Sequence, residues 1–227
     1  MTATFTLVDS LALGDLQVFL GRAARVDEGS VRLIGGAGVL AVYVSVLHPA
    51  GLLDQSPTVL GLRTFALASK EDFDAVVPVK SLLARVDSAA EEPANAEGGP
   101  VAVRLPMSVN TVTWAAITPP RGGWVAIDSV PSAVLDEAAR VGIDEVAEAI
   151  PTGTGEALVH KVRTEVWGRP LDEPDYIPAG AGFAAVSLGF IGDDEEAASI
   201  YESGAWTRLT TKRGHVLVKR RAWSVAR

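Results

Sequence analysis

One stretch of the sequence combines an arginine with tryptophans in a way that could bind an anion. Residues 114–124 read WAAITPPRGGW and place Arg121 between Trp114 and Trp124. A guanidinium group offers a planar fork of N–H donors to a carboxylate or phosphate, and a tryptophan ring can hold the cation by stacking. With His160 as a further polar side chain, these residues form our candidate site for a small anionic ligand.

A second stretch, residues 206–216 (WTRLTTKRGHV), repeats the spacing of the first. Five positions match: Trp114, Ile117, Thr118, Arg121 and Gly122 align with Trp206, Leu209, Thr210, Arg213 and Gly214. A strand that begins at tryptophan, a turn that closes at Arg-Gly and a return strand of valine would explain both without a ligand, with glycine in the left-handed conformation. We interpret the repeat as two hairpins. A site used twice remains the alternative, and it requires the hairpins to lie side by side.

The remaining candidates for chemistry are weak. The segment GAGFAA, residues 180–185, matches the dinucleotide-binding fingerprint in form, but no buried strand precedes it. The chain has no cysteine, and its three histidines do not have the spacing of metal ligands. The acidic runs 172–175 and 193–196 lack the spacing of a known ion-binding loop. We therefore predict no metal and no cofactor, and the sequence shows no catalytic signature.

Charge is unevenly distributed along this acidic chain of 227 residues, whose net charge is −8. Residues 205–227 carry seven basic and no acidic side chains, whereas residues 101–204 carry sixteen acidic and six basic ones. The basic patch that we single out comprises Arg208, Lys212, Arg213, Lys219, Arg220 and Arg221. We expect it to pair with acidic segments, including residues 193–196, within one chain or between chains. A nucleic-acid contact is the alternative, which the acidic body disfavours.

The pattern of elements predicts an α+β fold in two parts. The small, acidic, Pro- and Gly-containing segment Ser88–Pro100 reads as a linker or mobile loop between an α+β part at 1–87 and an α+β part at 101–227. We expect helices at 13–26, with Leu13, Leu16 and Leu20 on one face, and at 78–86, 132–150 (broken at Gly142 in one alternative), 154–167 and 178–191. Strands are expected at 39–47, 100–105, 110–118 and 123–127, and a hairpin at 205–223.

The uncharged stretch Leu33–Leu53 is too often interrupted to cross a membrane. Only residues 39–47, VLAVYVSVL, are continuously apolar, which is the length of a strand and far short of the roughly 20 residues of a spanning helix. The start of the chain has no secretory signal pattern. We expect a cytoplasmic protein with no membrane contact.

Three functional hypotheses follow, in order of preference. The first is a non-catalytic interaction or regulatory protein that self-associates as a homo-oligomer, because catalytic signatures are missing and charge is segregated. The second is an enzyme or binder of a small anionic metabolite with Arg121 as the anchor. The third is weak nucleic-acid binding through the basic C-terminal hairpin.

Overall fold

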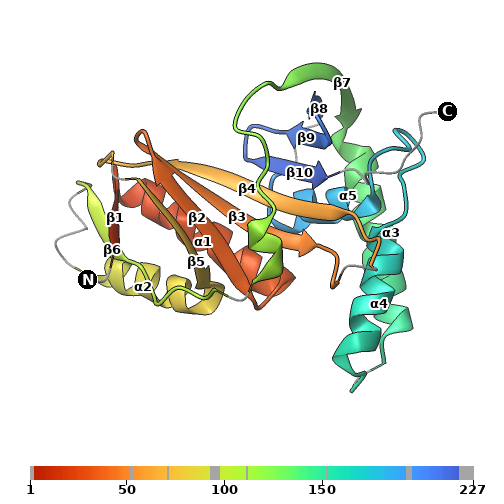
Figure 1. Ribbon diagram of the computed structural model, residues 1–227, viewed down its shortest axis with the longest axis horizontal. Coiled ribbons are helices and arrows are strands. Elements are labelled where there is room, and N and C mark those ends of the chain that lie inside the picture. The colour runs from red at the N-terminus through yellow and green to blue at the C-terminus, as the bar shows by residue number, and fades with distance from the viewer. Residues whose placement is uncertain are drawn as a thin grey trace. The chain divides into compact units, whose positions relative to one another are not determined.

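The computed structural model describes residues 3–51, 54–70, 72–92, 98–110, 112–151, 153–192 and 196–219. The fold is α+β, with α-helices and antiparallel sheets, as predicted (Figure 1). The chain forms two compact units: unit 1 is Met1–Val44 with Leu62–Ile117, and unit 2 is Ser45–Gly61 with Thr118–Arg227. Strands β3 (Val39–Leu47) and β4 (Thr58–Ala66) contribute residues to both units.

Unit 1 packs two helices against antiparallel strands. Its further elements are β1 (Thr4–Leu7), α1 (Ser10–Val26), β2 (Ser30–Gly36), β5 (Phe73–Pro78), α2 (Val79–Glu91) and β6 (Val101–Arg104). Its strands follow the order β5-β2-β3-β4, and β1 pairs with β6. Helix α1 begins after Asp9, whose Oδ1 accepts a hydrogen bond of 2.7 Å from the Ala12 N–H. It buries the predicted face of Leu13, Leu16 and Leu20.

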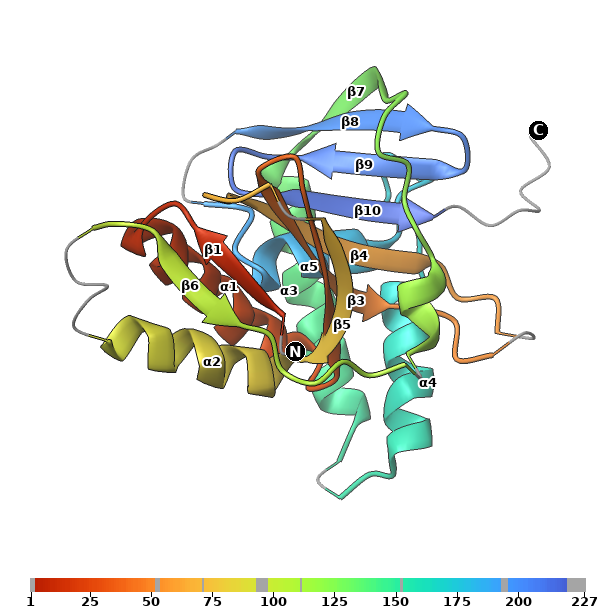
Figure 2. The same cartoon turned by 60° about the vertical axis from the view of Figure 1, so that its left-hand side comes forward.

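Unit 2 combines antiparallel strands with three helices in its described residues. Its elements are β7 (Val125–Pro131), α3 (Ser132–Ala149), α4 (Glu156–Trp167), α5 (Ala179–Ser187), β8 (Ala197–Ser203), β9 (Trp206–Thr210) and β10 (His215–Lys219). The strands follow the order β4-β10-β9-β8-β7, and Figure 2 shows β8, β9 and β10 side by side. Helix α5 packs between α3 and β10 and is buried, as the apolar segment 178–191 predicted.

A strand leads into a helix with a similar burial pattern in each unit. The buried residues Val77, Leu82, Val86 and Ala89 of β5 and α2 have the same spacing as Val130, Leu135, Ala139 and Gly142 of β7 and α3, although α2 also buries Val79, where α3 has the half-buried Ser132. A proline stands at the N-cap of both helices, Pro78 and Pro131. Its fixed φ suits the change from strand to helix, and its missing N–H costs nothing there. The two units therefore share a local strand–helix design.

The two Trp-to-Gly stretches adopt different structures, so the prediction of two equivalent hairpins is wrong for the first. Residues Thr113–Ala116 form a 3-10 helix that buries Trp114, and no strand spans the described residues 112–118. The second stretch does form the β9–β10 hairpin, as predicted. Gly214 has no positive φ there. It is needed because a Cβ at this position would lie 2.3 Å from the Phe190 ring.

The predicted linker and helix break differ from the observed elements. Residues Ser88–Glu91 belong to α2, and residues 93–97 lie outside the described part. Helix α3 runs through Gly142 without a break, because the glycine lies against the Trp167 ring. The predicted strand at 39–47 is β3. Among the described residues, no helix has both the length and the apolar character needed to span a bilayer.

Candidate interaction site around β7 and Arg208

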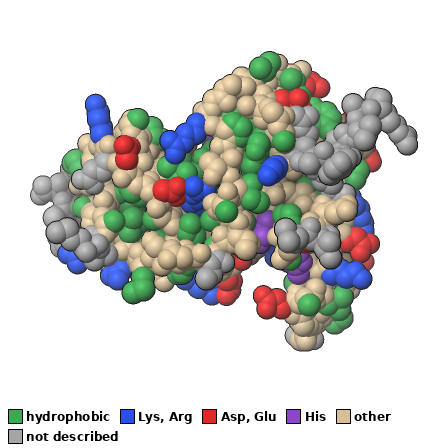
Figure 3. All heavy atoms as spheres, in the orientation of Figure 1, with side chains coloured by type: hydrophobic (Ala, Val, Ile, Leu, Met, Phe, Trp, Pro, Cys, Tyr) green, Lys and Arg blue, Asp and Glu red, His purple; other side chains and the backbone are tan. Residues whose placement is uncertain are grey.

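Strand β7 forms one edge of the sheet in unit 2 and pairs only with β8 among the described strands. Of its seven residues only Val130 is buried. Val125 is 64% exposed and Ile127 is 46% exposed, which is unusual for apolar side chains on a strand. Figure 3 shows hydrophobic side chains on the surface in this region. An exposed edge with apolar side chains is a typical contact surface for another chain.

A register shift between Ala126 and Asp128 determines how the β7 edge can contact another chain. It leaves Ile127 as the extra residue of a bulge, and bulges redirect a side chain and twist an edge strand. The charged Asp128 follows directly. Both features work against addition of a further strand to the β7 backbone, so the edge is better suited to contact through the side chains of Val125 and Ile127.

Next to β7, the side chain of Arg208 lies against two aromatic rings. Its Cζ atom is 4.6 Å from the centroid of the Trp124 ring and 4.7 Å from that of Tyr201. Tyr201 faces Arg208 directly across the β8–β9 pair. The Trp124 ring is itself fixed by a hydrogen bond of 3.2 Å from its Nε1–H to the Pro120 carbonyl oxygen. The sheet and the loop before β7 thus position one cation between fixed partners.

Burial and charge change the ionisation of this group of residues. Burial lowers the pKa of Arg208, since the charged form loses water, although Tyr201 acts in the opposite direction. Burial and the nearby Arg208 charge also lower the pKa of His215 below 6.5. The His215 Nδ1 atom lies 3.0 Å from the Thr210 Oγ1 atom. His215 is therefore neutral at pH 7, and Arg208 is the charged member of the group.

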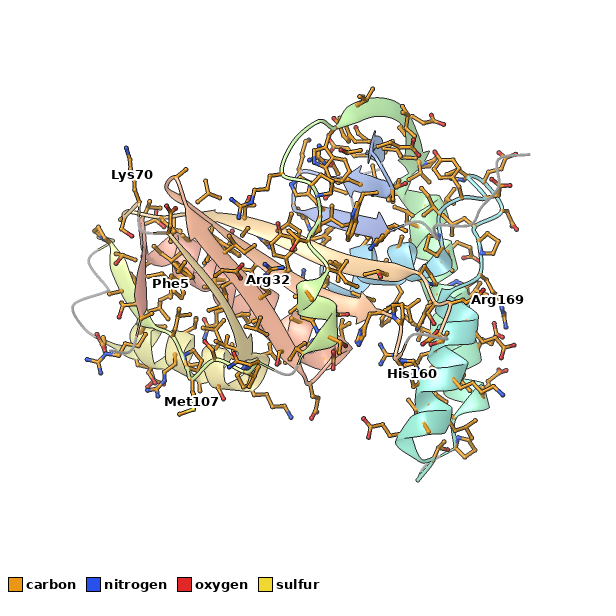
Figure 4. The ribbon with its side chains drawn as sticks, viewed as in Figure 1. Phe5, Arg32, Lys70, Met107, His160 and Arg169 are labelled. Carbon is orange, nitrogen blue, oxygen red and sulfur yellow. The ribbon has the colours of Figure 1, made fainter. Side chains whose placement is uncertain are left out.

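The residues of the predicted ligand site belong to two different compact units. Trp114 is buried in unit 1, whereas Arg121, Trp124 and His160 belong to unit 2. Arg121 is exposed, and the arginine that contacts Trp124 is Arg208. His160 lies on α4 (Figure 4). The role of these four residues in ligand binding stays a prediction.

Sequence reasoning assigned Arg208 to the basic patch but missed its aromatic partners. The usable signal was the two-residue turn Gly204 and Ala205, where Gly204 has a φ of +56° and closes a β8–β9 hairpin that sets Tyr201 opposite Arg208. The contact with Trp124 has no local signal.

The rest of the basic patch is partly neutralised. Lys212 forms an ion pair with Glu196, as expected for the acidic run 193–196 facing the basic segment. The guanidinium of Arg213 packs over Gly192. Lys219 is exposed at the end of β10, and Arg220 and Arg221 lie outside the described residues.

Helix α3 adds an acidic surface to unit 2. It carries Asp136, Glu137, Asp144, Glu145 and Glu148 against Arg140 alone. A groove of about 800 Å³ is lined partly by α3, and its charged lining residues are Glu137, Glu145, Asp172 and Glu173 with Arg169. This face would repel phosphate and suits a cationic partner better. The described residues hold no cluster of three or more side chains that could bind a metal ion.

Two family models match the chain, and each covers just under half of it. One, described as Domain of unknown function (DUF8010), matches residues 1–110. The other, described as Domain of unknown function (DUF8185), matches residues 119–223. The junction between them lies close to the division of the compact units after Ile117. No curated protein matches the sequence.

Solved structures give a likeness over the whole chain. The fold is similar to that of DNA polymerase sliding clamps. The clamp from Caulobacter crescentus aligns with a TM-score of 0.51 and 12% identity over 98% of this chain and 66% of the clamp, and a second structure, of Caulobacter crescentus pol III beta, has a TM-score of 0.51 and 13% identity. The clamp from Bacillus subtilis has a TM-score of 0.50 and 11% identity, over 100% of this chain and 66% of the clamp. The chain thus spans slightly less than two thirds of the length of these clamps.

Proposed function

We propose that this protein is a non-catalytic interaction protein that self-associates, and that β7 forms part of the contact between copies. The observation that carries the proposal is the exposed apolar pair Val125 and Ile127 on a sheet edge. The likeness in fold to sliding clamps supports a scaffolding role over a catalytic one. Cytoplasmic location and a regulatory role remain parts of the same proposal.

The residues around β7 indicate how two copies of the chain would make contact. Trp124, Tyr201 and Arg208 flank β7, and tryptophan, tyrosine and arginine are the residue types most enriched among energetically dominant interface residues. Burial of two aliphatic side chains contributes roughly 1.5–3 kcal/mol each at full burial. Together with the aromatic group, this provides a compact apolar centre with a polar rim, as interfaces commonly have.

The test is sedimentation velocity over a wide concentration range, with Ile127→Lys as the variant. A lysine on the edge introduces a charge that must be desolvated on association, so we expect the oligomer to dissociate at concentrations where the wild type is assembled. Ile143→Lys is the matched control, because Ile143 is 43% exposed, close to the 46% of Ile127, and lies on α3 in the same unit. We expect it to leave assembly unchanged. A wild-type protein that stays monomeric at every concentration would overturn self-association, and an assembled Ile127→Lys protein would exclude β7.

The charge distribution does not favour nucleic acid as the principal partner. The chain has a net charge of −8, α3 presents an acidic face, and Lys212 is paired with Glu196, so the charge near these surfaces disfavours phosphate. Weak binding through the basic C-terminal segment stays the lesser alternative, and its test is described in the Discussion.

A further inference from the structure

Arg208 differs from the other strongly positioned cations of this protein. Arg32, Arg63, Lys80, Arg140, Arg169 and Lys212 each form an ion pair with a carboxylate. The Arg208 side chain forms neither a hydrogen bond nor an ion pair with any residue that the structure describes, although the chain contains 28 acidic residues. A partly buried cation without a counter-charge is costly, so this arrangement calls for an explanation.

The two rings hold the guanidinium group but do not satisfy it. Trp124 and Tyr201 contact its Cζ atom through their ring faces, which leaves its in-plane N–H groups without acceptors. The Nε atom is one of three buried side-chain polar atoms without a hydrogen-bond partner in the described residues. The two Nη atoms are not among them, and Arg208 is partly exposed. The guanidinium therefore presents its terminal edge to solvent.

We propose that Arg208 binds a carboxylate group, whose two oxygens accept hydrogen bonds end-on from Nη1 and Nη2. The fork of an arginine matches the planar carboxylate in geometry. The rings keep the guanidinium in place before the ligand arrives, so little side-chain entropy is lost on binding. The neighbours Tyr201, Thr210 and His215 add polar groups but no second full charge, which fits a ligand group with a single negative charge.

The carboxylate can come from a small molecule in solution or from an acidic side chain of a second copy of the chain. Both sources present the same group to the same two nitrogens. The second source rests on the proposed self-association, whereas the first does not. An experiment with two arms separates them.

The first arm is a titration of the wild type with sodium acetate, followed through the Trp124 indole N–H signal in ¹H–¹⁵N NMR spectra. Sodium chloride at the same ionic strength is the control. We expect a saturable shift with acetate alone, absent in Arg208→Met and retained in Arg121→Met. Arg121 is the matched control because it is an exposed arginine in the same loop as Trp124 and contacts no aromatic ring of the described residues.

The second arm compares self-association of the same variants by sedimentation velocity. If a second copy supplies the carboxylate, Arg208→Met weakens association by about tenfold or more, as expected for the loss of a charge-assisted pair, and Arg121→Met does not. Arg208→Lys, which keeps a cation beside the rings but lacks the fork, replaces Arg208→Met if the latter does not fold. Saturable acetate binding that requires Arg208 supports the proposal, and an added loss of self-association in Arg208→Met names a second copy of the chain as the source. Acetate binding with unchanged self-association names a small molecule. Negative results in both arms, with folded variants, overturn the proposal.

Discussion

The replacement Gly142→Ala tests the packing of unit 2. Helix propensity alone would make this replacement stabilising, whereas we expect it to lower the free energy of unfolding. Gly142 lies inside α3 against Trp167. An ideal Cβ at this position would be 2.2 Å from Cζ3 and 2.6 Å from Cη2 of the Trp167 ring. To restore an ordinary contact of 3.4 Å, the ring must move by about 1.2 Å, the difference between 3.4 and 2.2 Å.

Trp167 has little room for this movement. Its side chain is 2% exposed, and its ring stacks on Phe183 at a centroid distance of 4.3 Å. The start of the Trp167 side chain is also confined, because a Cβ at Gly180 would be 2.9 Å from the Trp167 carbonyl oxygen and 3.2 Å from its Cβ. Alanine is favoured over glycine in a helix by about 1 kcal/mol, but forcing an extra methyl group into a packed core costs about 1–3 kcal/mol or more. We expect a net loss of about 2 kcal/mol in the free energy of unfolding.

Gly21→Ala provides the matched control. Gly21 lies in the interior of α1, and no atom comes within 4 Å of its ideal Cβ. The same chemical change should therefore stabilise the protein by up to about 1 kcal/mol. Urea denaturation measures both changes, and thermal melting should move by roughly 2–4 °C per kcal/mol for a chain of this size. If Gly142→Ala is as stabilising as Gly21→Ala, the close contact between α3 and Trp167 is wrong.

Two further predictions concern charge. Arg208→Met should raise the pKa of His215 toward 6.5, because one of the two causes of its lowering is removed, and NMR titration of the imidazole measures this; an unchanged pKa would show that Arg208 does not act on it. In the wild type, unfolded His215 takes up a proton more readily than folded His215, so its contribution favours the folded state fully above pH 6.5 and is lost as the pH falls below that value. For duplex DNA we expect no measurable change in fluorescence anisotropy even at about 50 mM salt, where phosphate contacts are strongest. Binding that weakens steeply with added salt would instead restore the basic C-terminal segment as a nucleic-acid contact.

The local sequence pattern alone was sufficient to predict several elements of the fold. The apolar spacing of Leu13, Leu16 and Leu20 predicts the buried face of α1, and the β-branched run 39–47 predicts β3. The same holds for the C-terminal hairpin and for the burial of α5. Periodicity predicts these elements because the spacing of apolar residues determines which face of a helix or strand is buried. Charge segregation likewise predicted contact between the acidic run 193–196 and the basic segment, which the Lys212–Glu196 pair confirms.

The two Trp-to-Gly stretches have the same residue spacing, so only the tertiary structure determines their different conformations. Trp114 and Trp206 begin the same pattern, but one becomes part of a 3-10 helix and the other begins a strand, since a strand needs a neighbouring strand to supply its hydrogen bonds. Arg208 and Trp124 meet because the pairing of β7, β8 and β9 brings the loop before β7 beside β9. The Gly204 turn is a local signal for the pairing of β8 with β9, but no local signal in the sequence encodes the pairing of β7 with β8. The candidate site therefore depends on the order of strands in the sheet, which arises only when distant segments bury their apolar faces together.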